Sequence, residues 1–394
     1  MQPARPSNKN KYIAAIVVLL LVSISVYAYL ISTKSTPLPN GTILVLPVNI
    51  TPDNSGNIDP QWNRYAAMDM LIYQLNLGVN YPLLQTEDII NIISLVSNEQ
   101  PNKTIDIKQM MAISGAVLVI ESSITGANNQ YQLAFTLHQQ QHTETGVVNA
   151  SSIEQVLLTA ANLMAQQIHP QQNKTTPQLH SRFSPPQLVS AIALLQGGDT
   201  VAAEEQLTAL INTTPDNLVA QRLLASIQLQ QHQYQQLNTT LIAAIDLATH
   251  QQDERELARL RLLLAQSYTE TDRIEQALGV LTIAKTNAAK VKDWLTLGYI
   301  SQLAGMINQR IGRNDEAREQ FKKAIEYHQI MGYPIGQTQA LNELAELEVI
   351  EFNYPQAYRY INRSYELVAH RGLDDLEKTT FKLMTKIENK MQHR

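Results

Sequence analysis

The residues with the best spacing for chemistry are two histidines four positions apart. His138 and His142 stand at the end of a strand-like segment, and Glu144 follows closely. On a regular strand these positions would share one face, so two imidazoles and a carboxylate could approach a divalent cation. Two histidines without a fixed third ligand are more often solvated residues of a hairpin. We therefore predict no metal site here.

Other catalytic patterns are missing from the sequence. It has no cysteine, which excludes disulfides, thiolate zinc sites, a cysteine nucleophile and a lipidated cysteine anchor. Phosphate-binding loops and the GxSxG and HExxH motifs are also absent. Glu87–Asp88 and Asp374–Asp375 begin predicted helices, where the helix dipole favours acids. We predict no enzyme activity and no cofactor.

The charge balance argues against nucleic acid as a direct partner. Lys and Arg number 30 against 35 Asp and Glu, giving a net charge of −5. No basic stripe of the kind that follows a phosphate backbone is present. At 394 residues the chain has room for two or three domains, because single cores rarely grow to that size.

The first element is a predicted transmembrane helix at residues 12–31. It has no charged residue, and 20 residues at ~1.5 Å each give about 30 Å, the thickness of a bilayer core. Positive charge is concentrated in residues 1–11, which we therefore place in the cytoplasm as a short tail. The rest would be exported, with residues 32–40 as a linker. The alternative is a signal peptide cleaved after Val26-Tyr27-Ala28.

Residues 41–169 predict a small α+β domain with a mixed sheet. The pattern is β-α-β-α-β-β-β-α, which packs helices on one sheet. Gly78 would give the first helix a left-handed end. The expected strands cover 42–48 (stopped by Pro47), 79–84, 116–124, 131–138 and 146–148, and the expected helices cover 62–75, 86–95, 105–113 and 151–168.

Several strand segments carry a resemblance to a known domain. These are Ile43–Val48, Gly115–Ile124, Asn129–Leu137 and Thr143–Gly146. They resemble the TolB-like amino-terminal domain in the exported part of membrane-bound CadC-type and ToxR-like regulators. That family usually has Phe after the first-strand proline, where this chain has Val48. The resemblance implies the fold first, and a regulatory role only by analogy.

After a predicted linker at 170–184, residues 185–372 contain an internal repeat of about five units. One position, alanine in four of the five units, recurs at spacings of 34, 40, 40 and 40. Three further positions recur with it, four and seven residues after it and twelve residues before it. We call these the repeat contact positions: Ala203, Leu237, Ala277, Ala317 and Ala357; Leu207, Leu241, Leu281, Phe321 and Ile361; Leu210, Ala244, Ala284, Ala324 and Ser364; Ala191, Ala225, Ala265, Gly305 and Ala345.

This pattern has a physical cause. Two antiparallel helices cross closely only where both have small residues, and a large apolar residue one turn later fills the space to the next pair. It resembles the tetratricopeptide repeat (TPR), and Pro215 ends the first unit as that motif favours. Residues 373–394 form an amphipathic stretch that would cap the solenoid. The alternative is an unrelated helical bundle. The expected fold class is α+β followed by an all-α solenoid.

The first helices of such an array line a concave surface, which is the candidate binding site. Arg, Tyr and Met side chains suit recognition of a protein or peptide partner. Ordinary surface residues are the alternative. The positions expected to face the groove are Arg222, Arg259, Gln266, Tyr299, Gln302, Met306, Gln309, Asn342 and Glu346.

Two functions fit these features. The first is the sensory, exported component of a CadC-like signalling system. No winged-helix domain precedes Tyr12 in this sequence, so such a system would need a separate DNA-binding regulator, or the chain would be a shortened relative of a full regulator. The second is an envelope scaffold or chaperone-like adaptor at the inner membrane. Both act through protein–protein interaction.

Overall fold

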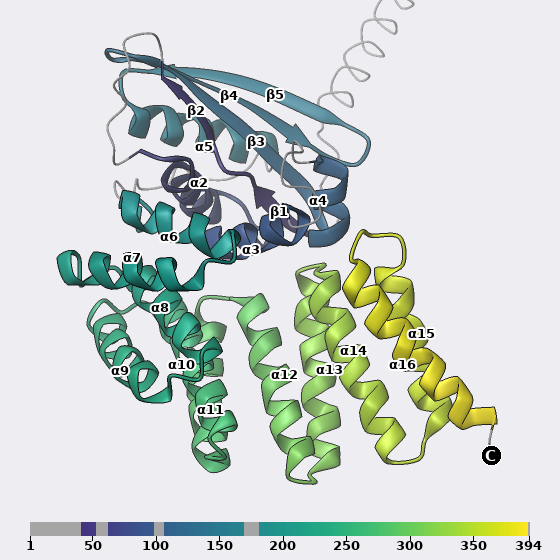
Figure 1. Cartoon of the computed structure of the whole chain (residues 1–394). Helices are drawn as coiled ribbons and strands as arrows, with labels where there is room; N and C mark the ends of the chain where they lie inside the picture. Colours follow the sequence, from purple (N-terminus) through teal and green to yellow (C-terminus); the bar gives the residue numbers. More distant parts are fainter. Residues whose placement is uncertain (1–40, 53–61, 98–105, 169–180, 393–394) are drawn as a thin grey trace, which may run out of the picture.

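The computed structural model describes residues 41–52, 62–97, 106–168 and 181–392 (Figure 1). The predicted cytoplasmic tail, transmembrane helix and first linker lie outside these ranges, as does most of the predicted linker at 170–184. Within the described ranges, no helix has both the length and the apolar character that crossing a membrane requires. The architecture is a small α+β region followed by a long array of TPR-like helical hairpins.

The α+β region is a mixed sheet with helices on it. The sheet follows the order β1-β3-β4-β5, and β2 also pairs with β3. β1 and β2 run parallel to β3, while β3, β4 and β5 are antiparallel neighbours. The elements are β1 (Thr42–Val45), β2 (Asn49–Pro52), α2 (Arg64–Gly78), α3 (Thr86–Ser97), α4 (Ile107–Ser114), β3 (Ala116–Ala127), β4 (Gln130–His138), β5 (Thr143–Ala150) and α5 (Ile153–Ile168).

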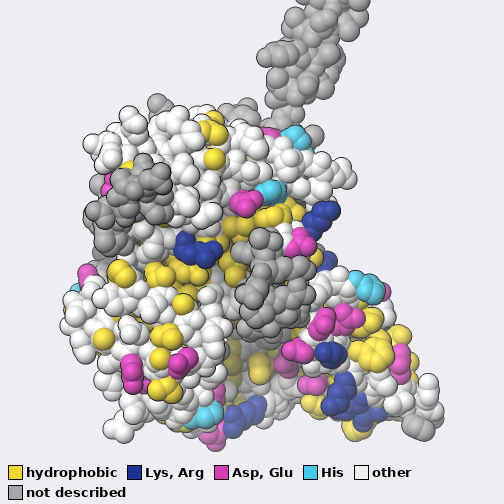
Figure 2. Space-filling view, turned by 45° about the horizontal axis from the view of Figure 1, so that its top comes forward, with side chains coloured by type: hydrophobic (Ala, Val, Ile, Leu, Met, Phe, Trp, Pro, Cys, Tyr) yellow, Lys and Arg dark blue, Asp and Glu magenta, His cyan; other side chains and the backbone are white. Residues whose placement is uncertain are grey.

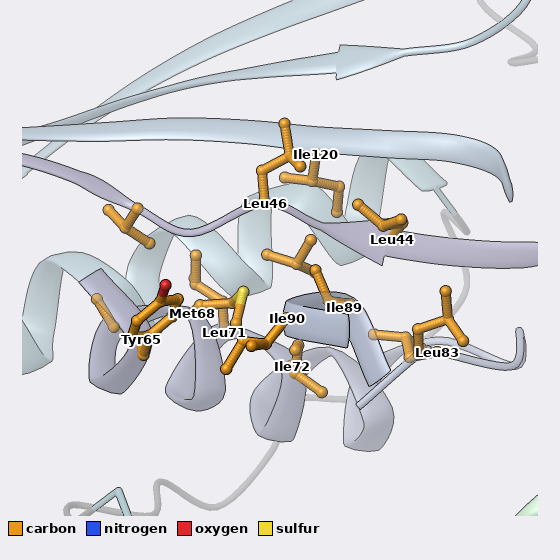
Figure 3. Close-up of a cluster of buried hydrophobic side chains, with 14 of the residues drawn as sticks. Leu44, Leu46, Tyr65, Met68, Leu71, Ile72, Leu83, Ile89, Ile90 and Ile120 are labelled. Carbon is orange, nitrogen blue, oxygen red and sulfur yellow. The ribbon is translucent and has the colours of Figure 1, made fainter. Parts of the chain in front are cut away.

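The hydrophobic pattern of the sequence accounts for the core of this region. Leu44 and Leu46 lie in one buried cluster with Met68 and Leu71 of α2 and Ile89 of α3 (Figure 3). These side chains are at most 4% exposed. β3 and β4 are joined by a two-residue turn, in which Asn128 and Asn129 have φ of 51° and 66°. That conformation is the one that matches the twist of a hairpin.

One predicted strand of this region is wrong, and another strand was not predicted. The segment 79–84 is not a strand, since its pairing in the described region is one bridge from Leu83 to Ile43. The first strand ends at Val45, just before Pro47, but no second strand was predicted after it: the Leu46 N–H donates to Ile120 O (2.8 Å), and Asn49–Pro52 pair with β3 as β2. Proline removes one ladder donor, which opens the ladder without redirecting the chain.

The predicted cap at Gly78 is also wrong. Gly78 is the last residue of α2, and the cap residue is Val79 in an extended conformation. The Val79 N–H still donates to Leu75 O at 2.8 Å, so the helix end is satisfied without a left-handed residue. A left-handed cap does end α4, where Gly115 has φ of 70°.

The helical array consists of five hairpins and a final helix. Its elements are α6 (Pro186–Gln196), α7 (Thr200–Thr213), α8 (Leu218–Gln230), α9 (Tyr234–His250), α10 (Glu254–Glu270), α11 (Ile274–Lys290), α12 (Trp294–Arg310), α13 (Asn314–Ile330), α14 (Pro334–Ile350), α15 (Tyr354–Val368) and α16 (Asp374–Gln392). All of the repeat contact positions are buried. Gly305 is required because a Cβ there would lie 2.6 Å from the Phe321 ring.

The 40-residue period is two 20-residue units. From α9 to α14 each helix has 17 residues, and a three-residue turn follows. From the α8–α9 turn onward, every turn between helices contains a residue with positive φ, at a constant spacing of 20. These residues are His232, Gln252, Asp272, Lys292, Gly312, Gly332, Phe352 and Gly372.

The α+β region and the array share one hydrophobic core, whereas the sequence analysis assigned them separate cores joined by a linker. Ile43 and Leu188 belong to one buried cluster that also includes Leu295 and Tyr333. Backbones touch as well, since a Cβ on Gly115 would lie 1.7 Å from Gly332 O. In Figure 1 the α+β region rests across the upper ends of the array's helices. The two parts are therefore one body.

Candidate functional site: the inner groove

A cavity of about 1420 Å³ runs along the inside of the array. Its walls are the first helices of successive hairpins, α8, α10, α12 and α14, together with α16 and the start of α3. We call this cavity the inner groove. It is larger than the roughly 300–1,000 Å³ of a small-molecule site. Figure 2 shows Lys and Arg side chains gathered with apolar ones over the C-terminal helices of the molecule.

The structure brings most of the predicted site residues together. The inner groove is lined by Arg222, Arg259, Gln266, Tyr299, Gln302, Met306, Asn342 and Glu346. Gln309, near the end of α12, is not among the lining residues. Whether these residues bind a ligand stays a prediction. Their convergence follows from the repeat, because equivalent positions of successive first helices face the same way.

The lining residues form columns at the 40-residue spacing. One column reads Leu263, Leu303, Glu343, Leu383, and the neighbouring columns place Lys382 beyond Asn342 and Lys386 beyond Glu346. Helix α16 therefore stands where the first helix of a sixth unit would stand, and it also forms the end wall of the groove. Residues 373–394 were predicted only as a cap, so Lys382, Leu383 and Lys386 were not among the predicted site residues. Extending the period once more would have found them.

The largest omission concerns α3. Asp88 and Asn91 line the groove although they belong to the α+β region. Arg222 donates from Nη2 to Glu87 Oε1 at 2.5 Å and from Nε to Glu256 Oε2 at 2.7 Å. Arg259 donates from Nη1 to Glu87 Oε2 at 3.2 Å and from Nη2 to Asp88 Oδ2 at 2.9 Å. The interpretation of Glu87–Asp88 as helix-start charges alone is therefore wrong.

Electrostatics within this cluster favour the charged forms of Glu87 and Arg259, whereas burial raises the pKa of Asp88. Burial would raise the pKa of Glu87, but the Arg222 and Arg259 guanidinium groups outweigh it and lower that pKa to about 2. Burial disfavours the charged form of Arg259, yet Asp88 and Asp293 raise its pKa well above the usual value. The two arginines are thus engaged by the protein's own carboxylates. Whether they also contact a ligand stays a prediction.

A different charged pair lies open in the groove. Glu343 and Glu346 are three positions apart on α14, so their side chains are neighbours on one helix face. Burial and the Glu346 carboxylate raise the pKa of Glu343 to about 7. Lys382 and Lys386 also line the groove, but within the described residues neither forms an ion pair with Glu343 or Glu346.

Tyr299 is held in the wall rather than free to move. Burial, with a hydrogen bond to Tyr333, raises its pKa well above the usual range. Behind it lies His328, which is 0% exposed, with its ring 5.2 Å from the Tyr299 ring. The imidazole fills the space that Gly298 and Gly336 leave, since a Cβ on either would lie within 2.5 Å of it. Burial lowers the pKa of His328 to about 4, so it is neutral at pH 7.

The two hairpin histidines are placed apart from the groove. His138 Nε2 lies 3.0 Å from Glu121 Oε2 across the β3–β4 pair. His142 Nε2 lies 3.3 Å from Glu144 Oε1. Across the described ranges no group of three or more His, Asp or Glu side chains is arranged to hold a metal ion.

Comparisons with known proteins yield fold similarities only. No family model matches the chain, and no curated protein does, so no CadC- or ToxR-like family is assigned. A Rap protein complexed with Competence and Sporulation Factor matches with a TM-score of 0.47 and 14% identity, over 82% of this chain and 84% of that one. BtubC (BKLC) from P. vanneervenii gives a TM-score of 0.43 and 18% identity, over 52% and 83%.

A thermophilic TPR protein in Thermus thermophilus gives a TM-score of 0.40 and 20% identity, over 50% of this chain and 97% of that one. These values are low, so the assignment to TPR-like repeats rests on the chain's own helices and contact positions. TPR proteins generally act through protein–protein interaction and are typically not catalytic.

Proposed function

We propose that this protein is a non-enzymatic binding protein that holds a peptide segment of a partner protein in the inner groove. The observation that carries the proposal is the cavity of about 1420 Å³ along five helices of the array and the start of α3. Its shape suits an extended chain better than a compact metabolite. Its lining alternates amide side chains such as Gln302 with apolar ones such as Leu303 and Met306. Such a surface offers hydrogen bonds to a peptide backbone and contacts to its side chains.

The position of α3 supports a sensory role. Asp88 lies in the groove and is bonded to Arg259, so a ligand in the groove would contact both parts of the protein. We propose that the α+β region reports the bound state to other proteins in a CadC-like system with a separate DNA-binding regulator. In this proposal residues 12–31 anchor the chain in the inner membrane with the described regions in the periplasm.

Site-specific crosslinking tests the binding proposal. A photo-reactive amino acid at Met306, which is 44% exposed in the groove, should crosslink the partner in intact cells. The same group at Ile242, 67% exposed on α9 and outside the groove, is the control. Mass spectrometry of the crosslink identifies the partner segment, which is then synthesised and its affinity for the purified protein measured.

The proposal requires that Met306→Lys weaken binding of that synthetic peptide at least tenfold, because a charge is placed on the contact surface, while Ile242→Lys leaves it unchanged. Equal affinities for both variants would refute it.

A C-terminal alkaline phosphatase fusion tests the proposed membrane anchor: activity in the membrane fraction is expected. Release of a shortened soluble form would show cleavage after Ala28. Copurification with envelope assembly factors, rather than with a regulator, would favour the scaffold function.

A further inference from the structure

The charge in the inner groove is not evenly distributed, and one position breaks the repeat. The column at 40-residue spacing has Leu263, Leu303 and Leu383, but Glu343 stands at its third place. Leucine at this position packs against its neighbours, as Leu303 does within the core of the array. A carboxylate there gains nothing from packing and loses part of its hydration. Packing therefore does not explain why a carboxylate stands here.

Among the residues that the structure describes, no Lys or Arg forms an ion pair with Glu343. Its nearest charged neighbour on α14 is Glu346, which has the same sign. The groove arginines, Arg222 and Arg259, are bonded to Glu87, Asp88, Glu256 and Asp293. Within the described ranges, Glu343 and Glu346 are in no ion pair with Lys382 or Lys386 across the groove. A half-buried carboxyl, Glu343, and an exposed one, Glu346, are left facing the cavity.

We infer that the inner groove selects a peptide with a Lys or Arg side chain, which lies against Glu343 and Glu346 while apolar residues on either side contact Leu303 and Leu383. This inference rests on the proposed function and specifies its ligand. A guanidinium or ammonium group would neutralise the repulsion between the two carboxyls and form charge-assisted hydrogen bonds in a partly dehydrated site. An acidic or uncharged residue would leave that repulsion in place.

Defined peptide pools test this inference with the full-length protein. Three pools of equal length carry Lys, Glu or Leu at the central position and degenerate residues elsewhere. Each pool is incubated with immobilised wild-type protein, and the retained peptides are quantified by mass spectrometry. We expect the Lys pool to be retained on the order of tenfold better than the Glu pool, as one charge-assisted contact provides.

Three variants test whether Glu343 causes the preference for the Lys pool over the Glu pool. Glu343→Gln keeps the shape, so it should still retain peptide but lose the Lys-over-Glu preference. Glu343→Leu completes the leucine column and should shift retention to the Leu pool. Glu326→Gln is the matched control, because Glu326 is exposed on α13 and outside the groove, and it should keep the wild-type preference. Circular dichroism confirms that each variant is folded.

The outcomes separate this inference from the proposed function. Retention of all three pools without a preference, or a preference that survives in Glu343→Gln, overturns the inference and leaves peptide binding standing. Retention of no pool by the wild-type protein overturns both.

Discussion

Arg259→Met should destabilise the whole protein because Arg259 joins its two parts. The guanidinium is 10% exposed and contacts Glu87, Asp88 and Asp293 at 3.2, 2.9 and 3.4 Å. Removing one partner of a buried ion pair costs about 3–5 kcal/mol, since the remaining charge is left without compensation. Methionine keeps most of the volume, so the loss measures the charge rather than a cavity.

The structure places the expected cost at the lower end of that range. Glu87 would keep Arg222 at 2.5 Å, and Asp293 would keep Arg255 at 4.0 Å. Asp88 has its pKa raised by burial, despite Arg259, so it can take up a proton when Arg259 is gone. We therefore expect a loss of about 3 kcal/mol in the free energy of unfolding.

Urea unfolding at pH 7 measures this loss. Trp62 reports on the α+β region and Trp294 on the array, and both signals should shift together because the core is shared. Asp88→Asn completes a double-mutant cycle, in which a coupling above about 1 kcal/mol is expected for directly bonded groups. Arg310→Met is the control: its bond to Asp272 is exposed and should contribute at most about 1 kcal/mol. A loss no larger than that of Arg310→Met, or additive effects within about 0.5 kcal/mol, would refute the reasoning.

Three further predictions concern packing and pH. His328 has a folded-state pKa of about 4, so as the pH falls the unfolded state takes up this proton before the folded state does. The free energy of unfolding should therefore fall between pH 6.5 and 4, by up to about 3 kcal/mol. In urea titrations at several pH values, His328→Gln should show a smaller fall. Ala317→Leu should lower the melting temperature, because overpacking a close helix contact costs about 1–3 kcal/mol; an unchanged melt would contradict the repeat register. Gly115→Ala should lower the free energy of unfolding far more than Gly312→Ala, since both glycines have positive φ but only Gly115 has no space for a Cβ. Equal losses in chemical unfolding would show that the contact between Gly115 and Gly332 can open to admit a side chain.

The parts of the structure that local sequence encodes were predictable. Helix pairs can be recognised because each helix must offer a small residue where it crosses its partner, as Ala277 and Ala317 do. The two-residue turn at Asn128 is equally local, because few residues accept its backbone conformation. The end of β1 near Pro47 is also local, because proline lacks a ladder donor, whereas the pairing of β2 depends on β3, which lies about 70 residues further on.

The contact between the two parts could not be predicted in this way. Glu87 and Arg259 are 172 residues apart, and each looks ordinary beside its sequence neighbours. Acids at a helix start and an arginine on a first helix have familiar local explanations. Their pairing depends on how the α+β region rests on the array, which is set by apolar residues such as Ile43 and Tyr333.

This contact changes how the groove should be tested. Arg222 and Arg259 were the natural residues to truncate as ligand anchors, but replacing them would leave Glu87 uncompensated and would loosen α3, which is itself part of the groove wall. Loss of a partner in such a variant would report on folding as much as on binding. Met306 and Glu343 make no such internal bonds within the described residues, so substitutions there change the surface and leave the wall intact. Substitutions at Met306 and Glu343 therefore test ligand binding, whereas substitutions of the two arginines test how strongly the α+β region is coupled to the array.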